Sequence, residues 1–210
     1  HCLEPSREGV TPPLLRNENA GAGLENCGPC GRPHLYGLHH FCTPMNPTDS
    51  HTRSPRHWLM KSEPQECSID DALAAPDATV PWTGVRNYQA RNFMRDGMQV
   101  GDGVLFYHSS CPEPGIAGLA RVASGTRPDP AQFEPASPYH DPKASPDAPR
   151  WLLLYVQALR KTRLLPLSEL RSHPPLADLR VLQKGSRLSI TPVDAVHWNH
   201  IVALLGKGCA

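Results

Sequence analysis

Short runs of β-forming residues, separated by glycine and proline, constrain the fold of this chain most strongly. One run follows the turn Gly101-Asp102-Gly103 and is bounded by a second loop with two prolines. Because β-branched and aromatic residues between turn signals are typical of strands, each run predicts a short strand. The strands are predicted at residues 57–62, 104–109, 116–122, 151–159 and 187–190.

Short helices are predicted between these strands. Ser68 and Asp71 have the spacing of a capping box, which opens a helix that runs to residue 75. Further helical segments are predicted at residues 88–95, from residue 168 and at 176–182. A last helix is predicted after a cap at residues 191–194, with one apolar face made by Val196, Ile201 and Leu204. Irregular alternation of short strands and helices indicates an α+β fold, a curved sheet or small barrel with peripheral helices.

The first part of the chain differs in composition from the rest. Residues 1–55 are rich in Pro, Gly, Asn and Thr and show no apolar period, so we expect a disordered tail followed by one domain at 56–206. Proline usage is high, at 24 of 210 residues, and hydrophobic residues make up only 39%. The first methionine is Met45, and we expect the natural start there, with the earlier residues being upstream sequence.

Charge and cysteine usage exclude several classes of protein. The net charge of +1 predicts no global field for nucleic acid, so any such binding needs a local patch. No apolar run is long enough for a bilayer and no secretory h-region is visible, so we expect no membrane attachment. We also expect a monomer. Cys67, Cys111 and Cys209 are predicted to be free thiols. Cys27 and Cys30 have the pair spacing of a zinc knuckle, but the remaining residues of zinc-ligand type are irregularly spaced and lack a hydrophobic shell, so we expect no metal site. These remaining residues are His34, His39, His40 and Cys42.

The segment 82–92 carries the residue types that bind nucleobases. Aromatic faces can stack on a base, amide groups can donate and accept hydrogen bonds, and guanidinium groups can hold phosphate. Such a mixture is costly in an apolar core, because buried polar groups need partners. It is typical of a pocket for a flipped or single-stranded base. The residues concerned are Trp82, Arg86, Asn87, Tyr88, Arg91 and Asn92.

Five blocks of sequence, in order and without large gaps between residues 57 and 205, resemble the EVE domain. The blocks lie at residues 58–64, 82–95, 101–109, 139–143 and 184–189. The resemblance implies a PUA-like fold, a strongly bent β-barrel with peripheral helices, related to YTH, ASCH and PUA domains. It also implies a reader of modified nucleobases, with modified cytosine in DNA as one suspected ligand class.

The resemblance implies roles for two pocket residues. Trp82 matches the place of a cage-wall tryptophan in YTH relatives; the alternative is a core anchor. Ser62 matches the serine of a Lys-Ser pair in YTH domains, which implies a contact to the edge of a base; the alternative is a hydroxyl that hydrogen-bonds within a turn at the end of a strand. Lys61 alternates to the opposite face of its strand, so we do not place it in one pocket with Ser62.

Other candidate ligand-binding residues have equally specific alternatives. Asn87 reads a base edge or caps the helix at residue 88. Arg86 and Arg91 lie at the rim and hold phosphate, although Arg91 also fits a solvated helix face. Tyr139 closes over a ligand or pins its loop to the barrel. Lys143, Lys184 and Arg187 add a basic rim or are only solvated.

The end of the strand at 104–109 is expected at the mouth of the pocket. By alternation, Tyr107 and Ser109 face one side and His108 the other. His108 is either a ligand contact or a satisfied core histidine. Catalysis by a Ser–His pair is not expected, because there is no nucleophile elbow and no acid is positioned to orient the imidazole.

We therefore predict a non-catalytic nucleic-acid binding module that recognises a modified base in DNA or RNA and needs no cofactor. The alternatives are a nucleotide- or RNA-acting hydrolase of the ASCH type, and a small-molecule or protein-interaction module. Inspecting whether His108 and Glu63 both face the Trp82 cavity would discriminate the hydrolase from the reader. The expected location is the cytoplasm of a bacterium, or the nucleus if the protein is eukaryotic.

Overall fold

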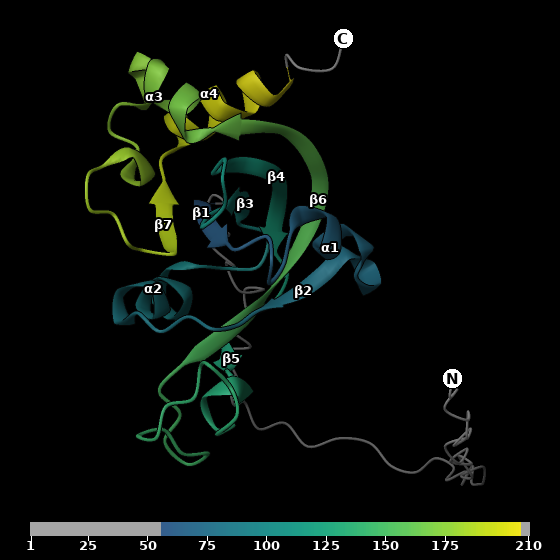
Figure 1. Ribbon diagram of the computed structural model, residues 1–210, viewed down its shortest axis with the longest axis vertical. Helices are drawn as coiled ribbons and strands as arrows, with labels where there is room; N and C mark the ends of the chain where they lie inside the picture. The colour runs from purple at the N-terminus through teal and green to yellow at the C-terminus, as the bar shows by residue number, and fades with distance from the viewer. Residues whose placement is uncertain (1–55, 207–210) are drawn as a thin grey trace, which may run out of the picture. The chain divides into compact units, whose positions relative to one another are not determined.

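The computed structural model describes residues 56–206 (Figure 1). Its elements in chain order are β1 (His57–Ser62), α1 (Ile69–Ala74), η1 (Pro76–Ala78), β2 (Thr79–Trp82), α2 (Tyr88–Asn92), the π-helical turn η2 (Phe93–Gly97), β3 (Gly103–His108), β4 (Gly115–Val122), β5 (Arg127–Pro128), η3 (Pro130–Gln132), β6 (Leu152–Pro166), α3 (Leu167–Ser172), η4 (Pro174–Leu176), η5 (Arg180–Leu182), β7 (Ile190–Val193) and α4 (Ala195–Gly206). The capping box at α1 is confirmed, because Ser68 Oγ accepts from Asp71 N while the Asp71 carboxylate accepts from Ser68 N.

One mixed sheet of seven strands organises the described residues. Its order is β2-β6-β4-β3-β1-β7, and β5 pairs with β6 beside this path. β1 and β3 are parallel, and the other pairs are antiparallel. Within residues 56–206, β2 and β7 are the two ends of the path, so the bent sheet does not close into a complete barrel. The predicted α+β, PUA-like fold is confirmed in this open form.

The long strand β6 bends the sheet around the interior (Figure 1). It pairs with β4 over most of its 15 residues and with β2 on its other edge. Irregular register between β4 and β6 falls beside Gly118, and a Cβ there would lie 2.6 Å from the Ile69 side chain. Glycine at this position therefore lets α1 approach the bend closely. The prediction of 151–159 was too short, since the basic residues at 160, 161 and 163 interrupt the apolar pattern by which the strand was identified.

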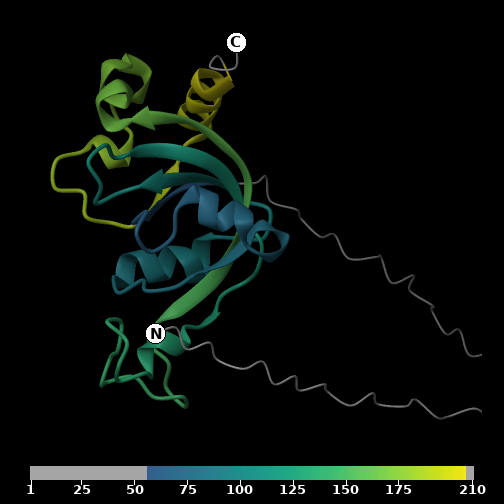
Figure 2. The same ribbon diagram turned by 45° about the vertical axis from the view of Figure 1, so that its right-hand side comes forward.

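Both faces of the sheet are buried. Trp58 and Met60 of β1 belong to one core cluster, which also contains Ile69 of α1 and Met94 of η2. Leu59, between them, belongs to a second cluster with residues of α3 and α4. Figures 1 and 2 show α3 and α4 together at one end of the molecule, away from α1 and α2. Alternate residues of a strand therefore belong to two separate cores, one on each face of the sheet.

Three local predictions were wrong. Trp82 ends β2 and does not belong to a loop. The last strand is β7, displaced from the predicted 187–190, and it contains Pro192 that we assigned to a helix cap. Proline is tolerated there because β7 is an edge strand, where a missing N–H breaks no central ladder. Val196 is 71% exposed, so it does not share the buried face of α4 with Ile201.

Several predictions fall partly or wholly outside the described residues. The tail at 1–55, Met45, the zinc-type residues and Cys209 all lie there. Within residues 56–206, Cys67 and Cys111 are free thiols, and no group of three potential metal-binding side chains occurs. No helix in this part of the chain is both long enough and apolar enough to span a membrane.

Candidate functional site

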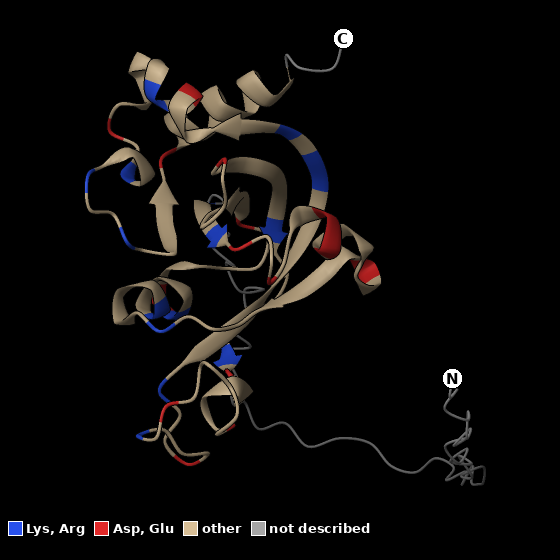
Figure 3. Cartoon of the chain, in the orientation of Figure 1, with Lys and Arg blue, Asp and Glu red and all other residues tan. Residues whose placement is uncertain are grey.

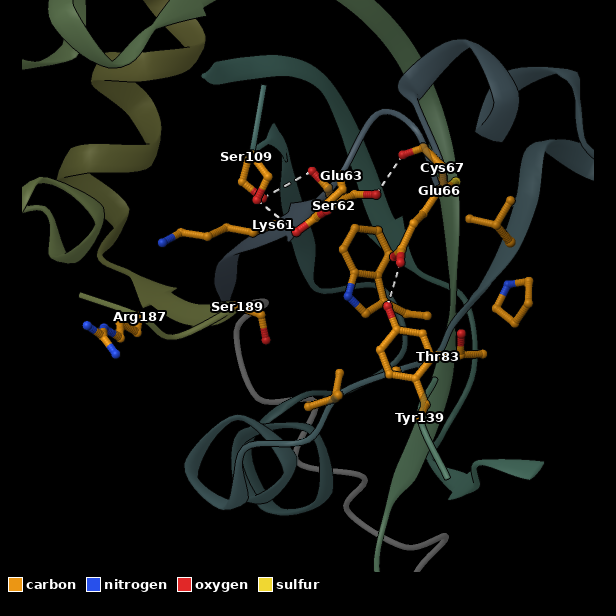
Figure 4. Close-up of a pocket in the computed structure, with 16 residues that line it drawn as sticks. Lys61, Ser62, Glu63, Glu66, Cys67, Thr83, Ser109, Tyr139, Arg187 and Ser189 are labelled. Atoms are coloured by element: carbon orange, nitrogen blue, oxygen red, sulfur yellow. Dashed lines mark hydrogen bonds between the residues drawn. The ribbon is translucent and has the colours of Figure 1, made fainter. Parts of the chain in front are cut away.

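A cavity of about 680 Å³ opens where β1, β2 and β3 end. Figure 4 shows that the loop carrying Tyr139 borders one side of it, while Lys61 and Arg187 lie on the opposite side. Its volume lies within the usual range for small-molecule sites. The lining residues are Lys61, Ser62, Glu63, Glu66, Cys67, Val80, Pro81, Trp82, Thr83, Gly84, Val85, Ser109, Ser110, Tyr139, Arg187 and Ser189. Of the predicted site residues, the cavity therefore brings together Ser62, Trp82, Ser109 and Tyr139, and of the predicted basic rim it contains Arg187.

Trp82 belongs to the cavity wall and to the core at the same time. It is 7% exposed, and its ring packs edge-on against Phe106 at 5.3 Å between centroids. The strand pairing of Trp82 with Leu154 fixes its backbone. The two alternatives drawn from the sequence are thus compatible: the core holds the indole rigidly, and the remaining surface lines the cavity.

Ser62 and Ser109 join the ends of the parallel strands β1 and β3. The backbone N–H of Ser109 donates to Ser62 O at 2.8 Å, and Ser62 Oγ donates to Cys67 O at 2.6 Å. Because a hydroxyl has one proton and two lone pairs, Ser62 Oγ keeps acceptor capacity toward the cavity. Beside it, Ser110 Oγ donates to Glu63 Oε1 at 2.7 Å.

The ring of Tyr139 packs over Gly84, a position where no other residue type fits without strain. Gly84 has φ +75°, and a Cβ there would lie 2.8 Å from Tyr139 Cζ. The Tyr139 hydroxyl donates to Glu66 Oε1 at 2.6 Å (Figure 4). That hydrogen bond and partial burial raise the pKa of Tyr139 to about 12. The ring thus joins the Tyr139 loop to the turn that follows β1.

Arg86 fixes the Tyr139 loop from outside the cavity. Its Nη1 lies 2.8 Å from the fully buried carboxylate of Asp129, and its Nε donates to Tyr139 O at 2.8 Å. Asp129 also accepts from the backbone N–H groups of Gly84 and Ala131. Arg86 does not line the cavity, so the structure replaces the predicted rim position with a position in the scaffold.

Comparison with known proteins identifies the family of this chain. The family model described as EVE domain matches residues 56–204. The chain belongs to the EVE domain family. It is 42% identical over 169 residues to human thymocyte nuclear protein 1, covering 72% of this chain and 74% of that protein.

Two solved structures of similar proteins share this fold. A crystal structure from Pseudomonas putida is 49% identical, with TM-score 0.67, covering 70% of this chain and 98% of that one. A human THYN1 protein in complex with 5-methylcytosine containing DNA is 41% identical, with TM-score 0.69, covering 73% of this chain and 99% of that one.

Two predicted site residues of this EVE domain, Asn87 before α2 and Arg91 within it, lie outside the cavity lining. Asn87 is the N-cap, and its Oδ1 accepts from the backbone N–H groups of Gln89 and Ala90 at 2.8 and 3.1 Å. Arg91 donates to Arg150 O at 2.9 Å, and its guanidinium lies 4.8 Å from the Tyr88 ring centroid. The capping alternative therefore describes Asn87, and Arg91 fastens α2 to the segment before β6.

His108 is a satisfied histidine at the end of β3. Its Nε2 accepts from the backbone N–H of Ile69 at 3.1 Å, and its ring packs edge-on against Phe106. Burial is the main cause of its lowered pKa, so the neutral ring that accepts this hydrogen bond is favoured. His108 does not line the cavity, whereas Glu63 does, so the two do not form an acid–base pair within it.

The cavity also contains residues that sequence reasoning missed or excluded. Lys61 lines it together with Ser62, contrary to the expectation from alternation, because the cavity opens around the end of β1. Figure 4 shows the Lys61 side chain extending toward Arg187, away from Ser62. Glu63, which was named from the sequence only as a possible partner of His108, lines the cavity without His108. No local signal indicated Glu66, because its partner Tyr139 lies 73 residues away.

Proposed function

We propose that this EVE domain binds a modified nucleobase of DNA in the cavity beside Trp82, without catalysing a reaction. The observation that carries the proposal is the rigid Trp82 wall next to hydroxyl and carboxylate acceptors in one cavity that is large enough to hold a nucleobase. A second support comes from the human THYN1 protein, whose structure was solved in complex with 5-methylcytosine containing DNA. The similarity to that protein extends over 73% of this chain.

The base enters the cavity only after it leaves the helical stack. Trp82 is almost completely buried in the wall of a concave site, and a nucleobase that is paired within a duplex cannot reach such a wall. Stacking on an aromatic side chain stabilises a bound base by about 1–3 kcal/mol. The fixed orientation of Trp82 against Phe106 reduces the entropy that binding has to remove.

The polar groups of the cavity favour a base that carries an exocyclic amino group. Ser62 Oγ has lone pairs available, and Glu63 and Glu66 supply carboxylate oxygens beside it. The amino group of cytosine is a hydrogen-bond donor that fits such acceptors. A methyl group that contacts the apolar wall adds about 0.8 kcal/mol, or about four-fold in Kd.

The arrangement favours binding over hydrolysis. Glu63 and Glu66, the acidic residues that line the cavity, already accept hydrogen bonds from Ser110 Oγ and the Tyr139 hydroxyl. The histidine that could complete an acid–base pair with them, His108, accepts from the Ile69 amide outside the cavity. Cys67 does line the cavity, but burial and the neighbouring Asp71 carboxylate raise the pKa of its thiol. The thiol is therefore a poor nucleophile at neutral pH.

The test is a panel of DNA oligonucleotides, with and without cytosine methylation, titrated against wild type, Trp82→Ala and Trp198→Ala. We expect about four-fold preference for methylated cytosine and a loss of about five-fold to hundred-fold in affinity for Trp82→Ala. Trp198 stacks on His57 and does not line the cavity, so Trp198→Ala controls for loss of an aromatic ring. Thermal unfolding of each variant separates binding from folding. Unchanged binding by a folded Trp82→Ala protein, or indifference to methylation, would contradict the proposal.

A further inference from the structure

A second cavity of about 410 Å³ adjoins the first. It lies between the end of β3, the start of α3 and the segment that joins η5 to β7. The two cavities share Lys61, Ser109 and Arg187 as lining residues. The full lining is Lys61, Tyr107, Ser109, Pro114, Leu167, Arg171, Val181, Gln183, Lys184, Gly185, Ser186 and Arg187.

The hydroxyl of Tyr107 is the unusual feature of this second cavity. Tyr107 is only 2% exposed and lines the cavity, and its hydroxyl has no hydrogen-bond partner among residues 56–206. A buried polar group without a partner costs free energy, which a ligand atom that accepts its proton would recover. Burial raises the pKa of Tyr107 to about 12, so the hydroxyl keeps its proton at neutral pH and acts as a donor.

The charges around this hydroxyl have one sign. Four cationic residues line the cavity, Lys61, Arg171, Lys184 and Arg187, and no acidic residue does. None of the four forms an ion pair with a described residue. Glu169, on the same helix as Arg171, is already paired with Arg163 at 2.7 Å. Burial lowers the pKa of Lys61, so a bound anion would favour its charged form.

A tight turn presents two of these cations. Gly185 has φ +81°, and the Ser186 N–H donates to Gln183 O at 3.2 Å. The turn places Lys184 and Arg187 on the cavity, and Ser186 O accepts from Lys61 Nζ at 3.4 Å. Figure 3 shows basic and no acidic positions along the segment from η5 to β7.

We propose that the second cavity binds a phosphate group, with Tyr107 donating a hydrogen bond and Arg171, Lys184 and Arg187 supplying the charge. This assignment rests on the proposed function: the phosphate belongs to the DNA strand whose base occupies the Trp82 cavity, because the two cavities share three lining residues. A free phosphate ion would make the same contacts as a phosphate of the DNA backbone, so two measurements are needed to distinguish these two sources.

The first measurement titrates single-stranded DNA, methylated and unmethylated, at several salt concentrations. Lys184→Gln and Arg171→Gln are each expected to lower the slope of log K against log salt by about 0.7, equally for both oligonucleotides. Tyr107→Phe is expected to weaken binding about ten-fold without changing the slope, because it removes a neutral donor. Arg160→Gln is the control, since Arg160 is exposed on β6 and lines neither cavity.

The second measurement follows the amide resonance of Gly185 during titration with inorganic phosphate. A shift that saturates in wild type and disappears in Tyr107→Phe supports the site, and unchanged slopes in the DNA experiment would then assign it to free phosphate. Variants that match Arg160→Gln in DNA binding, together with no phosphate-dependent shift, would overturn the site. Failure of the modified-base proposal gives a different pattern, in which methylation has no effect while the charge variants still lower the slope.

Discussion

The two flanks of the Trp82 cavity are built in opposite ways. The Tyr139 flank consists of Glu66, Gly84, Arg86, Asp129 and Tyr139, and it is joined by an ion pair and several hydrogen bonds. The cation flank consists of Lys61, Arg171, Lys184 and Arg187, and it contains no ion pair among the described residues. In the first flank, Arg86 is paired with Asp129 and Glu66 is hydrogen-bonded to Tyr139, whereas the cations of the second flank remain available to an anion.

This difference separates two physical tasks. A wall that is fixed before binding loses little entropy when a ligand arrives, and it therefore suits recognition of shape. Uncompensated cations favour an anion and make its binding depend on salt. The sequence alone suggested the reverse for Arg86 and Arg91, which we placed at a phosphate-binding rim.

The largest expected effect comes from breaking the Tyr139 flank at Asp129. In Asp129→Ala, Arg86 loses its carboxylate partner and the amides of Gly84 and Ala131 lose their acceptor. We expect the free energy of unfolding to fall by about 3 kcal/mol, measured by urea denaturation. Asp129→Asn keeps one acceptor oxygen and is expected to cost about half as much. Equal stability of Asp129→Ala and wild type would show that this flank is not held by the carboxylate.

The next effect comes from adding a methyl group beneath Tyr139. Gly84→Ala strains a backbone with φ +75° and places a Cβ 2.8 Å from the tyrosine ring. Gly101→Ala is the matched control, because φ there is +93° and no atom lies within 4 Å of the added Cβ. We expect strain of about 1–2 kcal/mol in both variants. Only Gly84→Ala should in addition weaken DNA binding, and equal DNA affinity of the two variants would contradict a role for Tyr139.

Local signals in the sequence were sufficient for some elements and for one wall of the cavity. The capping box at Ser68 fixed α1, since its partners are three residues apart. Alternation placed Tyr107 and Ser109 on one side of their strand, and both line the second cavity. Trp82 was recognised by its neighbours and by the family block, although its place in a strand was not.

Long-range partners explain what could not be predicted. Arg86 finds Asp129 at a separation of 43 residues, and nothing in either local sequence indicates that pairing. An arginine without a known partner is most easily interpreted as a phosphate contact, and that interpretation was made here. The second half of β6 was missed for a related reason, since its charged residues face solvent and resemble a loop.

A smaller effect is expected at alkaline pH from two tyrosines, Tyr139 of the Tyr139 flank and Tyr107 of the second cavity. The pKa of each is raised from 10.0 to about 12, mainly by the hydrogen bond to Glu66 for Tyr139 and by burial for Tyr107. Because the folded-state pKa exceeds the unfolded value, this stability is complete below pH 10 and is lost as pH rises toward 12. We expect a loss of about 1 kcal/mol per tyrosine by pH 11, after allowance for solvent screening.

Urea denaturation between neutral pH and pH 11 measures this loss. Tyr107→Phe and Tyr139→Phe should each remove part of the alkaline decline, and the double variant should remove both parts. A decline that is identical in wild type and the double variant would show that other groups cause it.

The smallest expected effect compares one arginine from each side of the cavity. Arg187 lines both cavities and has no ion pair among the described residues, whereas Arg91 is engaged by Arg150 O and the Tyr88 ring. If uncompensated charge is what holds DNA, Arg187→Gln should lower the salt slope of binding by about 0.7. Arg91→Gln removes the same charge and should leave the slope unchanged, although α2 loses a contact. A lowered slope for Arg91→Gln alone would show that Arg91 contacts phosphate, as the sequence suggested. It would also show that the two flanks do not differ in the way proposed.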